Sequence, residues 1–312
     1  MQPMVVESLN FIDLYLVSDG LAEVCDAEGL RPINSEELND DLKKLRDECI
    51  KASEDMQEFT LWRSVGDERY MYRGTKIQSS ESECVFVLRR VELKTRDLLS
   101  IGLTGDMRAL ITAPQSTGLV LVTGPMQSGK TTTAASMLKA RMDAVPGISS
   151  VLEDPPETRL SGRVGKGRCI QVHAGRHNGG YKEQITLALR SGANTIFIGE
   201  IRDKSTAIEV VNAASSGHLL ISTIHADSLG SAVERLVNLS GMGSSVIADC
   251  ITAVTHQVMR NAGVGAARRL VLKEVIIESD IRAAVKDENY EALDAASEQK
   301  RRNVRSLGVG RE

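Results

Sequence analysis

The fold of this chain is decided by the stretch Leu119-Val120-Leu121-Val122-Thr123-Gly124-Pro125-Met126-Gln127-Ser128-Gly129-Lys130-Thr131-Thr132-Thr133. Its first five residues form an apolar strand candidate, and the eight residues that begin at Gly124 satisfy the pattern G-x-x-x-x-G-K-[ST]. A helical pattern follows directly. These two flanking elements are what a phosphate-binding loop requires, and they disfavour the alternative of a glycine-rich turn with a chance lysine.

The residue types of this loop suit the phosphates of a nucleotide. Glycines let backbone N–H groups converge on phosphate oxygens, and the N-terminus of the following helix adds a positive dipole. Lys130 supplies a charge for the β- and γ-phosphates, and the Thr131 hydroxyl can bind Mg²⁺. We therefore predict ATP and Mg²⁺ as cofactors. The loop residues that we expect to contact them are Gly124, Pro125, Gln127, Ser128, Gly129, Lys130, Thr131 and Thr132.

Outward from the loop, short apolar runs alternate with helical patterns, which is the signature of an α/β domain. The strands that we expect span residues 119–123, 150–152, 195–198 and 219–223. The expected helices span residues 131–143, 182–191, 205–214 and 231–239. Beyond them, the pattern predicts a helix over 244–260, an extended segment over 270–277 and a helix over 279–296.

The length of 312 residues corresponds to about two domains. In the first part, Asn34 can cap a helix with apolar residues at helical spacing, and strand-like runs follow at 69–72 and 84–89. This part is predicted to be a small α+β domain over 1–100. The α/β domain is expected over 101–299, and a flexible basic tail over 300–312.

Composition excludes several classes of protein. Aromatic residues make up only 3% and the net charge is -4, so generic nucleic-acid binding is disfavoured. The chain has no basic N-terminal segment before an apolar run and no stretch of about 18 apolar residues, and we expect a cytoplasmic protein. The five cysteines are scattered singly, which predicts reduced thiols instead of a disulfide framework.

Two acidic clusters follow predicted strands. The first is Glu153-Asp154-Pro155-Pro156-Glu157, and the second is Gly199-Glu200-Ile201-Arg202-Asp203. An acid at the end of a parallel strand points into the ligand crevice, so Glu157 could deprotonate the attacking water. Glu200 has the place of the acid that holds Mg²⁺ in phosphate-loop enzymes. For the first cluster, an acidic surface turn is the alternative.

Two histidines bracket the predicted strand at 219–223. His225 falls at its C-terminal end, where it could hydrogen-bond a γ-phosphate. His218 stands at the start of the strand, and a purely structural role is an equal alternative for it.

Together, the segments 124–131, 153–157, 199–203 and 218–225 resemble the Walker A, Asp box, Walker B and His box of the secretion superfamily ATPases. This family comprises the motors of type II secretion, type IV pili and type IV secretion. The run Asp13-Leu14-Tyr15-Leu16 resembles the opening of the family's N-terminal PAS-like domain, with Tyr15 in place of a histidine. In the two strand-like runs, the family carries arginines that reach a nucleotide, which here are Arg69, Arg73 and Arg89.

The resemblance implies a PAS-like α+β domain followed by a RecA-like phosphate-loop domain, with six subunits in a ring. It implies that Glu157 is the catalytic glutamate, that Glu200 is the Walker B acid and metal ligand with Thr131, and that His218 and His225 form the His-box pair. Arg202 would make subunit or domain contacts. Such a ring would act peripherally at the inner face of the cytoplasmic membrane, on platform or secretion-channel proteins, with no direct nucleic-acid contact.

Departures from the family pattern bear on the subtype. The chain has no tetracysteine insertion and looks closest in layout to pilus-retraction and type IVB secretion or conjugative-pilus ATPases. The helix at 280–287 matches the retraction subgroup only in part, and further departures are Met126, Gln127, Pro156, Ala226 and Asp227. Two alternatives stay open: a nucleotide-binding assembly factor with little turnover, and a related ring motor that translocates DNA.

Overall fold

The computed structural model describes residues 4–26, 28–54, 56–80, 84–91, 95–261 and 268–308. The chain divides into two compact units. The first comprises Met1–Leu93 together with Pro155–Arg159, and the second comprises Lys94–Asp154 and Leu160–Glu312.

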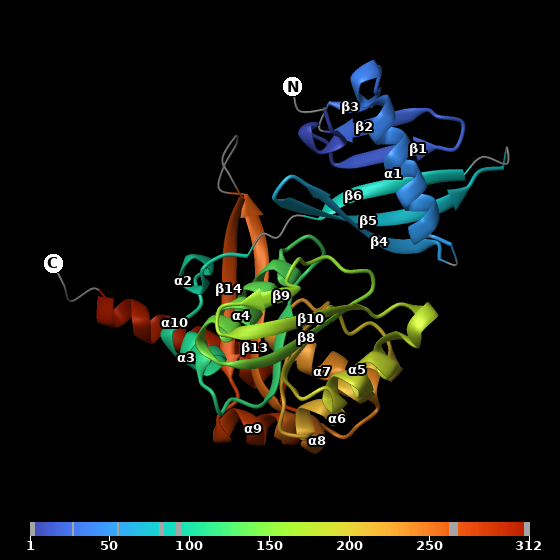
Figure 1. Ribbon diagram of the computed structural model, residues 1–312. Coiled ribbons are helices and arrows are strands. Elements are labelled where there is room, and N and C mark those ends of the chain that lie inside the picture. The colour runs from blue at the N-terminus through green and yellow to red at the C-terminus, as the bar shows by residue number, and fades with distance from the viewer. Residues whose placement is uncertain are drawn as a thin grey trace. The chain divides into compact units, whose positions relative to one another are not determined.

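The first unit is built on a six-stranded antiparallel sheet with the order β3-β2-β1-β6-β5-β4. Helix α1 lies across one face of this sheet (Figure 1). Aliphatic and aromatic side chains between helix and sheet form the core of the unit. The elements are β1 (Asp13–Val17), β2 (Ala22–Asp26), β3 (Gly29–Pro32), α1 (Asn39–Ala52), β4 (Glu58–Val65), β5 (Glu68–Gln78) and β6 (Cys84–Val91).

Helix α1 buries the apolar face that its sequence predicts, but it starts later than expected. Leu42, Leu45 and Cys49 are buried, in accord with the periodicity. Asn34 does not cap the helix, because a 3-10 turn over Glu36–Leu38 comes first and α1 begins at Asn39. Two acids in the first turn of α1, Asp40 and Asp41, favour this start through the helix dipole.

The second unit contains an eight-stranded sheet with the order β14-β13-β7-β12-β11-β8-β10-β9. The six strands from β13 to β10 run parallel, and β14 and β9 are antiparallel edge strands. The bounds are β7 (Gly118–Thr123), β8 (Gly147–Glu153), β9 (Gly162–Val164), β10 (Gly167–His173), β11 (Ala193–Ile198), β12 (Leu219–Ile224), β13 (Ile251–Asn261) and β14 (Arg268–Ile276).

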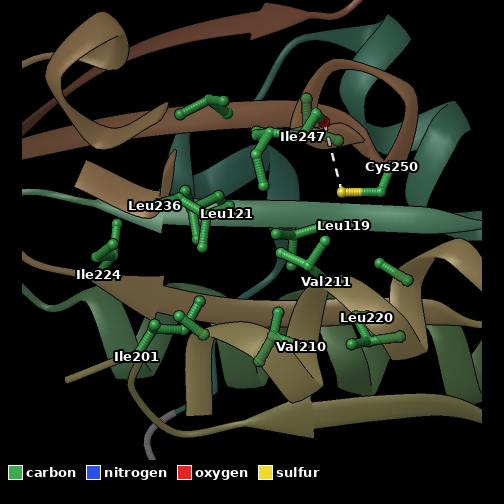
Figure 2. Packing of buried hydrophobic residues seen from close by; sticks show 14 of the residues in the cluster. Leu119, Leu121, Ile201, Val210, Val211, Leu220, Ile224, Leu236, Ile247 and Cys250 are labelled. Carbon is green, nitrogen blue, oxygen red and sulfur yellow. Dashed lines mark hydrogen bonds between the residues drawn. The ribbon is translucent and has the colours of Figure 1, made fainter. Parts of the chain in front are cut away.

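Helices cover both faces of this sheet, so the unit has three layers. Successive residues of β7 alternate between the two cores: Leu119 and Leu121 pack with α5 to α10, and Val120 and Val122 pack with α2 to α4. Figure 2 shows the core that contains Leu119 and Leu121, around β7 and β12. The helices are α2 (Leu98–Ile101), α3 (Gly105–Thr112), α4 (Lys130–Ala144), α5 (Gly180–Arg190), α6 (Lys204–Ser215), α7 (Leu229–Ser240), α8 (Ser244–Cys250), α9 (Ser279–Lys286) and α10 (Glu291–Gly308).

Each strand and helix predicted between residues 119 and 239 is present, but three predictions beyond that range are wrong. The predicted helix over 244–260 ends at Cys250 and gives way to β13, whose β-branched residues pair with β7. The helix predicted over 279–296 breaks into α9 and α10 at Glu288, where φ is 60°. The segment predicted as a flexible tail from residue 300 instead continues α10 to Gly308. Residues 309–312 lie outside the described residues.

Candidate nucleotide-binding site

The phosphate loop lies between the end of β7 and the first turn of α4. Gly124 and Gly129 have φ values of 148° and 85°, which are accessible mainly to glycine. A Cβ atom on Gly124 would also lie 2.1 Å from the backbone oxygen of Gln257. Gln127 adopts a φ of 58°, a left-handed conformation that costs a non-glycine residue about 1 kcal/mol. A strained residue in this loop indicates a backbone conformation that is held for function.

The loop offers donors for an anion. Helix α4 is 15 residues long, and the first N–H groups of a helix have no partner within the helix. The side chain of Ser128 is buried, and its Oγ has no hydrogen-bond partner among the described residues. The ammonium of Lys130 is also buried, and it donates to the backbone oxygens of Gly124 at 3.0 Å and Pro125 at 2.9 Å. Thr131 and Thr132 follow in the first turn of α4.

Three neighbouring parallel strands bring further groups to the same edge of the sheet. Strands β11, β12 and β7 are adjacent, so residues that follow their carboxyl ends lie close together. Glu200 follows β11, His225 follows β12, and the loop with Lys130 follows β7. This topology explains why motifs about 100 residues apart in the sequence converge at one place.

The convergence takes the form of a continuous contact chain. Lys130 Nζ lies 3.3 Å from His225 Nδ1, and His225 Nε2 lies 3.1 Å from Glu200 Oε1. Glu200 Oε2 accepts a hydrogen bond of 2.7 Å from Arg202 Nε. Burial lowers the pKa of Lys130, and the charge of Glu200 opposes this shift.

The contact chain also assigns the tautomer of His225. The ammonium of Lys130 can only donate, so Nδ1 of the ring must accept. The proton of the neutral imidazole is then on Nε2, from which it is donated to Glu200. A histidine in this arrangement links the cation of the loop to the acid that follows β11.

Gln257 supports the loop from β13, and it was missed by the sequence analysis. Its side chain is fully buried, and Nε2 donates a hydrogen bond of 2.5 Å to the backbone oxygen of Ser128. Gln257 falls within 244–260, the segment that the sequence pattern predicts to be a helix, so its position beside β7 was not expected. A strand assignment for 251–261 would have revealed it, because β13 then pairs with the strand that precedes the loop.

His218 is not part of this cluster. It directly precedes β12, whereas His225 directly follows it. A strand rises about 3.3 Å per residue, so the seven positions between the two histidines correspond to about 23 Å. The two residues therefore lie at opposite ends of the strand, and only His225 reaches the phosphate loop of its own unit.

Glu157 belongs to the segment Pro155–Arg159 of the first unit. Its Oε1 lies 3.2 Å from Nη1 of Arg73. Arg89 is the register partner of Arg73 across β5 and β6, and it forms two hydrogen bonds of 2.7 Å with Asp13. The first unit thus places Glu157 beside one of the three predicted arginines.

Arg69 is the third of these arginines, and its guanidinium carbon lies 4.7 Å from the ring centre of Trp62. Arg69 and Arg73 are four residues apart on β5, so their side chains leave the same face of the strand. The three arginines therefore occupy one side of the first unit's sheet.

A buried strand, a glycine-containing loop and a helix that begins with Lys130 and Thr131 define a phosphate-loop nucleotide-binding protein. Within this class, the chain belongs to the type II/IV secretion system protein family, which matches residues 64–309. Type II secretion system protein E of Klebsiella pneumoniae is 34% identical over 199 residues, which cover 62% of this chain and 38% of the relative. The chain spans only 34% to 38% of the length of the first curated relatives it matches.

Solved structures share the fold. The pilus retraction motor PilT with bound ADP superposes with a TM-score of 0.74 at 22% identity, covering 92% of this chain and 85% of that one. The ATPase DotB of Legionella pneumophila gives a TM-score of 0.73 at 20% identity, covering 96% and 85%. The predicted fold class, an N-terminal α+β domain followed by a RecA-like nucleotide-binding domain, is confirmed. None of the helices in the described part of the chain combines the length and apolar character that crossing a membrane requires.

Proposed function

We propose that this chain hydrolyses ATP with Mg²⁺ and drives a type IV secretion system or a conjugative or type IV pilus machine. The observation that carries the proposal is the contact chain that joins Lys130, His225 and Glu200. A lysine for the phosphates, an acid for the metal and a polar residue between them are groups that phosphoryl transfer requires. Membership of the secretion family supports the same conclusion.

The second unit supplies phosphate and metal binding in this proposal. Lys130 exchanges its contacts with the loop carbonyls for the β- and γ-phosphates, and the buried Ser128 Oγ gains a partner. The Thr131 hydroxyl and the Glu200 carboxylate offer the oxygen ligands that Mg²⁺ prefers, so the residues fit this ion. When bound, Mg²⁺ neutralises charge that develops on the phosphates. His225 then holds Glu200 in place and senses the γ-phosphate through Lys130.

The first unit supplies the general base. Glu157 accepts the proton of the attacking water, and the ion pair with Arg73 fixes the direction of its carboxylate. Arg69, Arg73 and Arg89 lie on the same side of their sheet. In this proposal, these three arginines bind the nucleotide. Arg202 joins the Walker B acid to a neighbouring domain or subunit.

At the level of the machine, we propose a homohexameric ring. The ring works peripherally at the cytoplasmic face of the inner membrane and moves a platform or secretion-channel protein as one unit rotates against the other. The pilus retraction motor and the DotB ATPase support this proposal by their likeness in fold. Deletion of the gene should abolish secretion, abolish pili or produce excess pili, and the phenotype identifies the system.

The test is ATP hydrolysis and nucleotide binding by the full chain, measured on assembled rings. Lys130→Ala should abolish both, because it removes the charge at the loop. Glu157→Gln should retain binding and lose turnover by about a hundredfold or more, the scale of a lost general base. Lys139→Ala is a matched control, since Lys139 lies on the exposed side of the same helix and pairs with Asp143.

Turnover in Lys130→Ala equal to that of the wild type would overturn the assigned site. Tight binding without turnover in the wild-type ring would favour the assembly factor. Stimulation of turnover by DNA, lost at high salt, would favour the DNA motor.

A further inference from the structure

The second unit contains a cavity of about 750 Å³ that the proposed function does not use. It lies among α2, the strands β13 and β14, and α10. Neither the phosphate loop nor any member of the contact chain from Lys130 to Arg202 lines it. Its volume falls within the range of cavities that hold small molecules, about 300 to 1,000 Å³.

The wall of this cavity is strongly basic in a chain whose net charge is -4. Arg260, Arg269 and Arg301 line it and form no ion pair within the described ranges. Two lysines complete the basic wall. Lys273 pairs with Glu298 at 3.1 Å, and Lys300 pairs with Asp106 at 2.5 Å. Three uncompensated guanidinium groups at one cavity attract an anion, and arginine matches the geometry of phosphate oxygens in particular.

Two residues that line the cavity each carry a buried oxygen without a partner among the described residues. Ser297 is only 2% exposed, and its Oγ has no hydrogen-bond partner in the part of the chain that the structure describes. Glu274 Oε1 accepts a hydrogen bond of 3.1 Å from the backbone N–H of Thr104, whereas Oε2 is buried with no partner among the described residues. In its ionised form this carboxylate oxygen can only accept a hydrogen bond, so a ligand group that donates one would complement it. Burial raises the pKa of Glu274, although the hydrogen bonds from Thr104 act to lower it.

We propose that this cavity is a second ligand site, which binds a hydroxyl-bearing phosphate ester of about the size of a nucleotide. The guanidinium groups of Arg260, Arg269 and Arg301 bind the phosphate oxygens. Glu274 Oε2 accepts a hydrogen bond from a hydroxyl of the ligand, and Ser297 Oγ pairs with a neighbouring polar atom. Leu270 and Leu272 supply an apolar wall for the carbon skeleton. This chemistry occurs in soluble sugar phosphates and in the headgroup of phosphatidylglycerol.

Titration calorimetry of the full chain with ribose 5-phosphate tests the site, and flotation with phosphatidylglycerol vesicles tests the lipid source. The double variant Arg269→Gln/Arg301→Gln should bind at least one probe tenfold or more weakly than the wild type. The variant Lys130→Ala should bind that probe as the wild type does. Glu274→Gln should weaken it at least threefold. Arg163→Gln/Arg168→Gln is the matched control, because these residues are exposed, oppose each other across β9 and β10, and carry the same charge.

The outcomes separate the alternatives. Binding of ribose 5-phosphate assigns a soluble ligand, and vesicle binding alone assigns a lipid headgroup. Loss of binding in Lys130→Ala with retention in the Arg269/Arg301 variant would overturn the site, because the phosphate loop would then be the binding place. Equal weakening in the Arg163/Arg168 control, no effect of Glu274→Gln, or binding of neither probe would also overturn it.

Discussion

Gln257 provides a test of how the phosphate loop is held, because it links the loop to the sheet by one hydrogen bond. Its Nε2 donates a hydrogen bond of 2.5 Å to the backbone oxygen of Ser128. Its Oε1 is buried and has no partner in the described part of the chain. Replacement by methionine keeps the volume of the side chain and removes both polar atoms. The substitution therefore separates the support of the loop from the packing of β13.

The two polar atoms have opposite effects on stability. Loss of the hydrogen bond lowers the free energy of unfolding by about 1 kcal/mol, and removal of a buried, unpaired oxygen raises it by about 1 to 3 kcal/mol. We expect the free energy of unfolding of Gln257→Met to stay within about 1 kcal/mol of the wild-type value or to rise slightly. The loop itself loses its support, so ADP affinity should fall by about fivefold to tenfold, which is the factor that about 1 to 1.4 kcal/mol gives.

The measurement is titration calorimetry with ADP, alongside chemical denaturation of the same preparations. Gln184→Met is the matched control. Gln184 is also buried, and its Nε2 donates a hydrogen bond of 2.7 Å to the backbone oxygen of Asn178. The control should lose stability and keep its ADP affinity. Unchanged ADP affinity in Gln257→Met, or an equal loss in both variants, would refute the role given to Gln257.

Three further predictions concern backbone, charge and pH. Gly124→Ala should abolish ADP binding, because its Cβ would lie 2.1 Å from the Gln257 oxygen; binding at wild-type affinity in calorimetry would contradict this. Arg63→Met should lower the free energy of unfolding by about 3 kcal/mol in urea titrations, since buried Glu7 loses the partner that lies 2.9 Å away; a loss below 1 kcal/mol would argue against it. Burial lowers the pKa of His256 below its ordinary 6.5, so the unfolded chain binds the proton more readily and acid weakens the fold. Thus, between pH 7 and 5, His256→Gln should lose less stability than the wild type in urea titrations, and equal losses would count against this reasoning.

The sequence predicts the phosphate loop and its neighbours well because each motif is local. The pattern around Lys130 sits between a strand and a helix, and Glu200 and His225 each follow an apolar run. Parallel strands place their carboxyl ends at one edge, so the convergence of these residues follows from the α/β pattern alone.

The same reasoning could not find Gln257, because local periodicity is ambiguous there. Ile251, Val254 and Val258 recur at helical spacing, yet the segment pairs with β7 and forms a strand. Non-local pairing decided between the two structures. Because 244–260 was predicted to be a helix, the support that Gln257 gives to the loop could not be predicted.

The contact between Arg73 and Glu157 also lay beyond local patterns. The two residues are 84 positions apart, and Glu157 lies in the short segment Pro155–Arg159, which belongs to the first unit. The basic cavity has a similar origin, since α2, β14 and α10 supply it from distant parts of the chain. Such sites depend on tertiary packing that no spacing rule contains.

We propose that the contact chain of Lys130, His225 and Glu200 forms a site that hydrolyses ATP. Its most direct test is the rate of phosphate release at saturating ATP and Mg²⁺, compared between the wild-type ring and Glu200→Gln. We predict multiple turnovers per subunit in the wild type, and a loss of about a hundredfold or more in the variant with ADP binding retained. Equal rates in the two proteins would contradict the claim.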